Sequence, residues 1–398
     1  MANTLLTPNQ ITREALRILH QKLTFIGNIN RSYDDSFAKS GAKIGDSLRI
    51  RLPNQYVVRS GATLNAQDTN EQSVTLQVNN QKGVDLNFTS VDLTLSLDDF
   101  STRILEPAMA VLAANIEADA LNMYKDVYNV VGTAGTVPNA LKTYLQARKV
   151  LNDNLAPMDN NRSMQLTTGA NVEIVDALKG LFNDSTQISK QYREGIMGRT
   201  AGFDWYENTL MPTHTNGTQA TGFKVNGAGQ TGLNLNIGDL TAANTLTKGT
   251  VFTIAGVYQV HPETKAITTN LQQFVVTSDF TASGTTGTVG ISPAIVTSGA
   301  LQNVNASPAN SAVCTVVSGA VSTGYGQNIA HHKDAFTFAT ADLIMPSGVD
   351  FAAREVFDGI SMRVVRQYDI NNDKFPCRID VLYGYKTIRP QLACRVTN

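Results

Sequence analysis

The chain has 398 residues and a mass of 42.9 kDa, and its 32 basic and 33 acidic side chains give a formal net charge of −1. This balance excludes a strongly basic nucleic-acid-binding surface or an acidic tail as the dominant feature. Charged residues make up only 16% of the chain, against about 25% in an ordinary soluble domain. A protein of two or three domains with so few charges either exposes little surface or buries much of it against copies of itself.

Neither a membrane span nor an export signal is expected. No run of about 18 uncharged apolar residues occurs. The N-terminal residues contain no basic stretch followed by an apolar one. Cys314, Cys377 and Cys394 are odd in number and far apart, which predicts buried thiols in a reducing compartment rather than a disulfide framework.

The N-terminal third predicts one short helix followed by strands. The helix is expected over 7–21, where Thr7 can cap the first turn and Pro8 suits its first position. Alternating apolar residues predict four strands, over 46–52, 73–78, 84–88 and 93–97. Between the first two strands lies the polar segment 54–71, with Gly61 near its middle. This segment predicts a long projecting β-hairpin or loop.

The strongest helix prediction begins near Pro107 and ends before Gly132 and Gly135. Apolar residues at steps of three and four predict one buried stripe, made of Met109, Leu112, Ile116, Ala120, Met123, Val127 and Val130. Polar residues are expected on the opposite face: Asn115, Glu117, Asp119, Asn122, Lys125 and Asp126. A helix of about 23 residues would be roughly 34 Å long.

Helices and strands alternate in the rest of the chain outside its middle. Helices are expected over 139–153 and 170–182. After the middle segment the chain resumes with 336–345. Strands are then expected over 362–368, 377–385 and 391–396, with a polar turn at 369–374. A sheet that joins the N-terminal third to the C-terminus would give a discontinuous α+β fold.

The middle of the chain, residues 213–325, has a different composition. It contains six charged residues: Lys224, Asp239, Lys248, Glu263, Lys265 and Asp279. Short stretches of alternating β-branched residues recur about every ten residues between turn residues, which predicts a small all-β sandwich or barrel. A disordered polar linker is the alternative, and the regular alternation argues against it.

Motifs of cofactor binding and catalysis are weak or missing. Gly227 to Gly232 matches G-x-G-x-x-G, but a strand pattern follows it where a dinucleotide site needs the start of a helix. We therefore interpret it as a β-turn. The sequence contains no phosphate-binding P-loop, no H-E-x-x-H and no G-x-S-x-G.

The titratable residues do not predict a site either. The five histidines are His20, His214, His261, His331 and His332. Neighbours on a strand point to opposite faces, so His331 and His332 cannot easily share a metal. The pairs Asp34-Asp35 and Asp98-Asp99 are interpreted as caps or solvated loops. Glu117 and Asp119 would lie about 200° apart around their helix and do not converge. No catalytic, cofactor or metal site is expected, and the chain is not expected to be an enzyme.

Several short segments resemble the coat-protein family of the short-tailed Salmonella phage P22. They are Tyr192-Arg-Glu-Gly195, Ala201-Gly-Phe-Asp204, Lys248-Gly-Thr-Val-Phe-Thr-Ile-Ala-Gly-Val257, His332-Lys-Asp-Ala335, Cys377-Arg-Ile-Asp-Val-Leu-Tyr-Gly384 and Thr387-Ile-Arg-Pro390. Their order and spacing carry the resemblance over about half of the chain. The N-terminal half is similar in its layout of arm, long loop and long helix.

The resemblance implies the capsid fold shared by tailed phages and herpesviruses, with an inserted β-barrel. The implied parts are an N-terminal arm (1–45), an extended loop (46–82), a peripheral domain with the long helix (83–138, completed by about 361–398), an axial domain (139–212 and 326–360) and the inserted barrel (213–325). The family's insert carries charged loops that contact neighbouring subunits. In this chain only the six charged residues named above could do so.

The resemblance also implies a function and partners. The chain would be the major capsid protein, assembled as pentamers and hexamers into an icosahedral phage head around a scaffolding protein, with a portal at one vertex. A decoration protein is a further possible partner. Double-stranded DNA would be packaged inside and touched only non-specifically, and no membrane is involved. Assembly would take place in the host bacterial cytoplasm, and the protein would end in the virion.

A second function is possible from the residues alone. Tyr258, Phe274 and Phe280 of the β-rich middle could form an aromatic platform, as in a carbohydrate-binding or adhesin-like module. Aromatic residues at strand spacing are more often part of a core. The low charge and the long polar loop favour the shell subunit.

Overall fold

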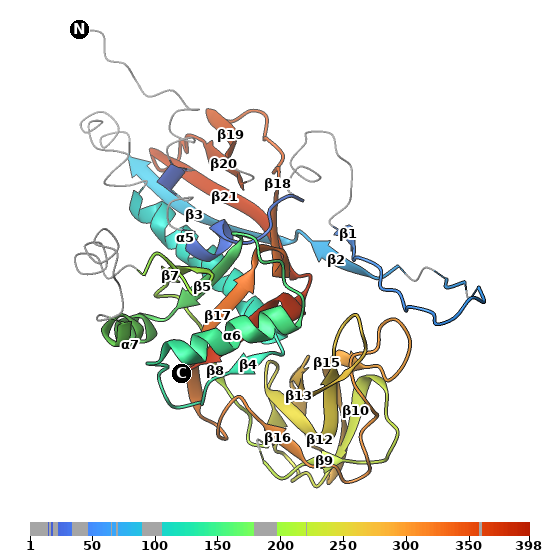
Figure 1. Ribbon diagram of the computed structural model, residues 1–398. Coiled ribbons are helices and arrows are strands. Elements are labelled where there is room, and N and C mark those ends of the chain that lie inside the picture. Colours follow the sequence, from blue (N-terminus) through green and yellow to red (C-terminus); the bar gives the residue numbers. More distant parts are fainter. Residues whose placement is uncertain are drawn as a thin grey trace. The chain divides into compact units, whose positions relative to one another are not determined.

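The computed structural model describes residues 15, 17–18, 23–33, 47–64, 66–68, 71–89, 106–178, 197–219, 221–357 and 360–398 (Figure 1). The chain forms two compact units. The first unit contains Met1–Ile50, Ser73–Leu121 and Phe336–Ile388, and the second contains Arg51–Gln72, Asn122–Ala335 and Arg389–Asn398. Helices and sheets occur in both units, which confirms the predicted α+β class. No helix in the described part of the chain is both long and apolar enough to cross a membrane.

The first unit is built on an antiparallel sheet around one long strand, β21 (Lys374–Thr387). The sheet order is β18 (Phe336–Ala341), β21, β20 (Ile360–Arg366) and β19 (Phe351–Phe357), and β3 (Asn80–Thr89) pairs with the other edge of β21. β3 comes from the N-terminal third, so the predicted joining of the two ends of the chain in one sheet is confirmed. Strand β19 was not predicted.

The predicted long helix is shorter than expected. Helix α5 covers Glu106–Leu121 and gives way to a 3₁₀ helix, η2 (Asn122–Asp126), and then to strand β4 (Val130–Val131). Its 16 residues span about 24 Å rather than 34 Å. The apolar stripe continued past Leu121 because Val127 and Val130 belong to the core of the following segments. Periodicity alone does not show where a helix ends.

The polar face predicted for this helix is also wrong at Glu117, which is fully buried. Its carboxylate accepts hydrogen bonds from the Thr24 hydroxyl at 3.0 Å and from the backbone N–H groups of Phe25 and Ile26 at 2.5 and 3.3 Å. These groups begin the short helix α2 (Thr24–Gly27), whose N-terminus attracts a negative charge. A buried carboxylate therefore attaches the N-terminal segment to α5.

The segment between the first two predicted strands is a hairpin. β1 (Ser47–Arg51) pairs with β2 (Ser73–Gln77), as predicted. The tip, of which 52–64, 66–68 and 71–72 are described, exposes most of its side chains. Val58 and Leu64 are 90% and 83% exposed.

The second unit contains a sheet of both parallel and antiparallel strands. Its order is β4, β22 (Ala393–Thr397), β17 (Gly324–His332), β5 (Arg162–Leu166), β7 (Phe203–Glu207) and β6 (Arg199–Thr200), and β8 (Thr213–Thr215) pairs with β17. We call it the seven-stranded sheet. The 3₁₀ helix η3 (Lys333–Ala335) directly follows β17, and the 3₁₀ helix η4 (Pro390–Leu392) directly precedes β22. The segment predicted as 361–398 is thus divided between two sheets, because β22 pairs with β17 and β4.

Two helices belong to the second unit. α6 (Leu141–Asp153) confirms the helix predicted over 139–153, and it buries Tyr144, Ala147 and Leu151. α7 (Thr168–Leu178) confirms the second prediction up to Leu178. Residues 179–182, the strand predicted over 93–97, most of the helix over 7–21, and His20, Asp34-Asp35, Asp98-Asp99 and Tyr192–Gly195 lie outside the described residues.

Residues 213–325, here called the β insert, form the predicted all-β structure (Figure 1). A nearly closed, barrel-like sheet has the order β16 (Cys314–Val316), β12 (Val251–Val260), β13 (Ile267–Val276), β15 (Thr286–Ile295), β10 (Gly232–Gly238) and β9 (Lys224–Val225). The insert also contains a separate two-stranded antiparallel sheet, made of β11 (Thr245–Leu246) and β14 (Phe280–Thr281). The insert has its own core, which includes Phe223, Phe252, Phe274 and Ile291.

The first and last residues of the β insert are hydrogen-bonded partners. Thr213, His214 and Thr215 of β8 pair antiparallel with Gly326, Tyr325 and Gly324 of β17. The chain therefore leaves the seven-stranded sheet and returns to it at one place. Such an arrangement allows a folded domain to be inserted without disturbing the sheet.

Gly384 offers a test of the packing in the first unit. A Cβ atom at this position of β21 would overlap the carbonyl oxygen of Gln77. Gly384→Ala should lower the free energy of unfolding by about 1–3 kcal/mol, as overpacking does elsewhere. Urea unfolding followed by circular dichroism measures this. Gly27→Ala is the control, because a Cβ there would meet nothing within 4 Å; equal stability of both variants would contradict the packing.

Candidate functional site

The β insert is fastened to the core of the second unit by the turn that leads into β12. Lys248 forms an ion pair with Asp126 at 3.2 Å, and its backbone N–H donates to Asp279 at 2.6 Å. Val251 packs with Tyr128, Val130 and Val275 in a separate apolar cluster. Lys248 and Val251 belong to the segment from Lys248 to Val257 that carried the resemblance. The structure shows that this motif makes the junction between the insert and the core.

Arg395 of β22 lies at the centre of this junction and is fully buried. Its Nη1 donates to the Gly249 carbonyl at 2.8 Å, and its Nη2 donates to the Lys125 carbonyl at 3.4 Å. The guanidinium also lies 5.3 Å from the centre of the Tyr124 ring, a cation–π arrangement. Burial lowers the pKa of Arg395 to about 10, so the side chain stays charged at neutral pH.

The close approach at Gly249 requires glycine. Its φ is +95°, and a Cβ would lie 3.1 Å from Lys125 Cγ and from His214 Cε1. His214 itself is buried, and its Nδ1 lies 3.3 Å from the Tyr124 hydroxyl. Burial, together with the charges of Arg395 and Lys125, lowers the pKa of His214 to about 3. The imidazole is therefore neutral and serves as a packing and hydrogen-bonding group.

A second fastening uses one side-chain amide. Val130 lies in β4, the edge strand of the seven-stranded sheet. Its N–H donates to Gln273 Oε1 at 2.7 Å, and its carbonyl accepts from Gln273 Nε2 at 2.9 Å. Gln273 belongs to β13 of the insert and so takes the place of a further strand at this edge. Covering an edge in this way prevents it from pairing with another chain.

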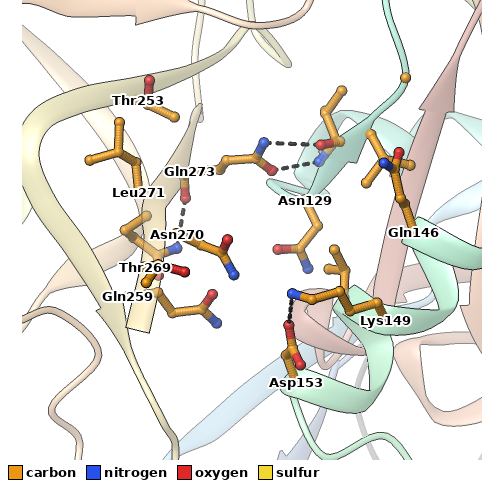
Figure 2. A pocket seen from close by; sticks show the side chains of 15 residues that line it. Asn129, Gln146, Lys149, Asp153, Thr253, Gln259, Thr269, Asn270, Leu271 and Gln273 are labelled. Carbon is orange, nitrogen blue, oxygen red and sulfur yellow. Dashed lines mark hydrogen bonds and ion pairs between the residues drawn. The ribbon is translucent and has the colours of Figure 1, made fainter. Parts of the chain in front are cut away.

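Beside Gln273 lies a polar cleft between β12–β13 and α6, with a volume of about 590 Å³ (Figure 2). We call it the amide cleft, because Asn129, Gln146, Gln259, Asn270, Gln272 and Gln273 are among its lining residues. Lys149 and Asp153 form an ion pair at 2.7 Å on its helical side. Gln259 Nε2 of β12 donates to Asn154 Oδ1, at the end of α6, at 3.2 Å.

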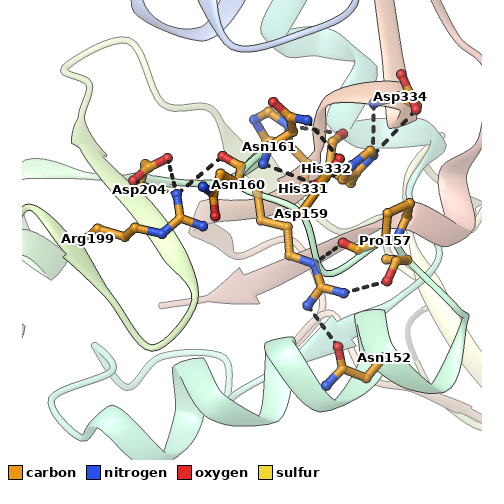
Figure 3. Close-up of polar contacts among 12 residues, drawn as sticks. Asn152, Pro157, Asp159, Asn160, Asn161, Arg199, Asp204, His331, His332 and Asp334 are labelled. Atoms are coloured by element: carbon orange, nitrogen blue, oxygen red, sulfur yellow. Dashed lines mark hydrogen bonds and ion pairs between the residues drawn. The ribbon is translucent and has the colours of Figure 1, made fainter.

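A polar network near the end of β17 contains the two adjacent histidines (Figure 3). His332 Nδ1 accepts from the Asp334 N–H at 3.2 Å, so the proton is on Nε2, which lies 3.0 Å from Asp159. His331 is buried, and burial lowers its pKa to about 4. The two side chains have different partners and do not form a common site. In the described part of the chain, no three His, Cys, Asp or Glu side chains are grouped to hold a metal.

The same network holds the loop after α6. Arg162 is buried, and its guanidinium donates to the carbonyls of Pro157 and Ala156 at 2.8 and 2.6 Å and to Asn152 Oδ1 at 2.8 Å. These bonds satisfy the carbonyl groups that follow the end of a helix. The contacts of Arg162 are structural, since they order the backbone of the loop after α6.

The remaining sequence candidates are placed as follows. Gly227 to Gly232 lead into strand β10, so the interpretation as a turn is confirmed. Phe274 lies in the insert core, Phe280 packs against it and Tyr258 is 37% exposed, so they do not form a platform. The three cysteines are buried and free. Burial raises the pKa of Cys314 to about 12 and that of Cys377 to about 11.

Residues 28–395 match the sequence model of the P22 coat protein family, described as P22 coat protein, gene protein 5. The chain belongs to this family. It is a major capsid protein that forms a phage head shell by self-association, and it is a component of the virion. The predicted resemblance and function are confirmed.

Solved structures similar to the chain include other phage capsids. A structure titled Mycobacterium phage Che8 is 13% identical, with a TM-score of 0.48, over 94% of this chain and 90% of that one. The capsid of the cyanophage P-SCSP1u is 11% identical, with a TM-score of 0.43, over 90% and 84%. The coat protein I-domain of CUS-3 is 30% identical, with a TM-score of 0.20, over 26% of this chain and all of that one. No curated protein sequence matches the chain.

The family member described here uses the charges of its β insert internally. Lys224 pairs with Asp239 at 2.9 Å, and Lys265 donates to the carbonyls of Ala300 and Gln302 at 2.7 and 3.2 Å. Lys248 and Asp279 take part in the junction described above. Five of the six charged side chains of the insert therefore have contacts within the chain. The sixth charged residue, Glu263, lies at the tip of the β12–β13 hairpin.

Replacing Arg395 tests the junction. Arg395→Met keeps a long unbranched side chain but removes the donors to the Gly249 and Lys125 carbonyls, and it should lower the free energy of unfolding by about 2–4 kcal/mol. Urea unfolding followed by the fluorescence of Trp205, the single tryptophan, measures the change. Arg378→Met is the control, because the exposed pair of Arg378 with Asp85 should contribute no more than about 1 kcal/mol. Similar losses in both variants would contradict the central role of Arg395.

The buried histidines predict how stability depends on pH. The folded-state pKa values of His214 and His331 lie near 3 and 4, below the value of about 6.5 in an unfolded chain. Between these values the unfolded chain binds more protons, so the free energy of unfolding should fall as the pH drops from 6.5 to 4.5. Each histidine should contribute about 1.4 kcal/mol per pH unit in this window. His214→Phe should reduce the slope, whereas Tyr124→Phe should keep it; an unchanged slope in His214→Phe would contradict the assignment.

Proposed function

We propose that this capsid protein is a non-enzymatic subunit that closes an icosahedral shell as pentamers and hexamers. The observation that carries the proposal is the hairpin tip between β1 and β2. Val58 and Leu64 expose almost their whole side chains there, and Tyr56 is 58% exposed. Apolar side chains exposed together on a long projecting segment are expected to be covered by a partner. In a shell of identical subunits, the partner at hand is the neighbouring copy.

The low charge of the chain supports the same proposal. Permanent assemblies bury upwards of about 2,000 Å² per interface and deplete charged residues there. Charged residues make up 16% of this chain. Since the β insert uses five of its six charges internally, its contacts with neighbours would be hydrogen-bonded and apolar rather than ionic.

The division into domains follows as part of the proposal. The arm would be 1–45, the extended loop 46–82, the peripheral domain 83–138 with part of the C-terminus, and the axial domain 139–212 and 326–360 around the β insert. The pairing of β8 with β17 supports 213–325 as an insertion. The antiparallel pairing of β3 with β21 supports a peripheral domain made from both ends of the chain.

The partners beyond the chain itself are also proposed. A scaffolding protein would guide assembly in the host bacterial cytoplasm, a portal protein would occupy one vertex, and a decoration protein could bind outside. Packaged double-stranded DNA would touch the inner wall non-specifically. A net charge of −1 suits such a wall, because a strongly basic lining would bind phosphates through counterion release.

The carbohydrate-binding alternative has little support from the structure. A sugar-binding platform needs aromatic faces on one surface, and Phe274 is buried in the core of the β insert. Binding of the full chain to a glycan array would revive this alternative.

Two exposed apolar residues test the shell proposal. Val58→Asp together with Leu64→Asp should change the free energy of unfolding by no more than about 0.5 kcal/mol, because both side chains are exposed in the single chain. The same variant should reduce the yield of closed shells at least tenfold, because a charge would be buried at the contact. Electron microscopy and sedimentation of the expressed protein measure shells. Thr63→Asp, also on the tip, is the matched control, and normal shells from the double variant would contradict the proposal.

A further inference from the structure

The turn between β9 and β10 begins with an asparagine followed by a glycine. Asn226-Gly227 and Asn216-Gly217 are the two Asn-Gly pairs of the sequence. At such a pair the glycine nitrogen can attack the side-chain carbonyl carbon of the asparagine, because glycine has no side chain to obstruct it. A C–N bond closes a succinimide ring, the Cγ–Nδ2 bond breaks, and the amide leaves as ammonia with the glycine N–H proton. Water then opens the ring to aspartate or isoaspartate.

The structure protects Asn216 from this reaction. The residue is buried, its Oδ1 accepts from the Ser318 hydroxyl at 2.7 Å, and its Nδ2 donates to the Ala320 carbonyl at 3.2 Å. The next residue, Gly217, is packed so closely that a Cβ would overlap the carbonyl of Thr245. Both ends of the side-chain amide must be released before a ring can close. Deamidation of Asn216 therefore requires local unfolding.

Asn226 has the opposite surroundings. Its side chain is exposed to water, and its amide has no hydrogen bond within the described part of the chain. The backbone around it is ordered by Gln230, whose Nε2 donates to the carbonyls of Asn226 and Gly227, both at 2.9 Å. Gln230 Oε1 also accepts from the N–H of Asn236 at 2.6 Å. The turn is therefore fixed, while the reactive side chain is free to rotate.

The nucleophile of the reaction is the backbone nitrogen of Gly227. Its N–H donates to Asn310 Oδ1 at 2.8 Å, in a segment 83 residues further along the chain. This nitrogen must lose its proton and turn toward Asn226 Cγ before it can attack. The amide oxygen of Asn310 holds the N–H in place and is too weak a base to remove the proton. One neutral hydrogen bond slows such a reaction without preventing it.

We propose that Asn226 is a deamidation site of this capsid subunit and that the Asn310 side chain controls the rate. The reactant is water, and the product adds a negative charge to the six charged residues of the β insert. The new carboxylate would lie two residues after Lys224, which pairs with Asp239 at 2.9 Å. Because the reaction needs no enzyme, the charge would accumulate with the age of the protein.

Peptide mapping by mass spectrometry tests the site. The folded full-length chain is incubated in mildly alkaline buffer, which favours loss of the N–H proton. Aspartate and isoaspartate should accumulate at Asn226 about tenfold faster or more than at Asn216, because Asn216 reacts only after local unfolding. Equal rates at the two sites in the folded chain, or no product at Asn226, would overturn the proposal.

The same chain unfolded in urea is the control for intrinsic reactivity. Asn226 follows Val225 and Asn216 follows Thr215, so each asparagine stands between a β-branched residue and a glycine. The two sites should therefore react at similar rates in the unfolded chain. A preference for Asn226 that persists in urea would show that the fold does not decide the site, and it would contradict the argument.

Replacing Asn310 tests how the rate is controlled. Asn310→Ala removes the acceptor and should raise the rate at Asn226 roughly two- to tenfold, as expected for the loss of one neutral hydrogen bond. Asn310→Asp keeps an acceptor and makes the hydrogen bond charge-assisted, so it should not raise the rate. Asn310 is exposed, and circular dichroism checks that both variants are folded. An unchanged rate in Asn310→Ala, or the same increase in both variants, would overturn the role of Asn310.

The charge of the product gives an independent readout. On native isoelectric focusing, aged wild-type protein should develop an acidic species that migrates with fresh Asn226→Asp. Asn226→Gln should not develop this species, because its longer side chain closes the corresponding ring far more slowly. The same acidic species in aged Asn226→Gln would assign the reaction to another residue and overturn the proposal.

Discussion

The burial of one guanidinium group determines how the second unit is held together. The buried guanidinium of Arg395 is stabilised by carbonyl acceptors at its two Nη atoms, and these carbonyls are 146 and 270 residues away in the sequence. The last strand, the 3₁₀ helix after α5 and the first turn of the β insert must therefore come together at once. Gly249 allows these segments to approach closely because it has no side chain. Gln273 makes a second contact between the insert and the core, at the edge strand β4. The insert is consequently part of the fold of its host unit.

The scarcity of charge has the same physical origin as these contacts. Charges in the β insert pair within the chain, as in the ion pairs Lys224–Asp239 and Lys248–Asp126. A capsid subunit has several neighbours, and each interface is more stable when no unpaired charge is buried there.

The departures from the sequence prediction have specific physical reasons. The apolar repeat past Leu121 suggested a longer helix, although the buried Val127 follows the 3₁₀ helix η2 and the buried Val130 lies in the edge strand β4. Glu117 was placed on a polar face, but its carboxylate is buried because it binds the start of α2. Arg395 and Gln273 carried no signal in the sequence, since a single Arg or Gln in a strand is unremarkable. Their roles depend on contacts that are distant in the chain.

The sequence by itself determined the mixed fold class, the all-β character of residues 213–325, the hairpin between 46 and 78, and the family, because these depend on local periodicity, composition and motif order. The tertiary structure decided which strands share a sheet, where α5 ends and which polar side chains are buried. Those features depend on hydrogen bonds and desolvation between residues far apart in the chain, and no local pattern encodes them.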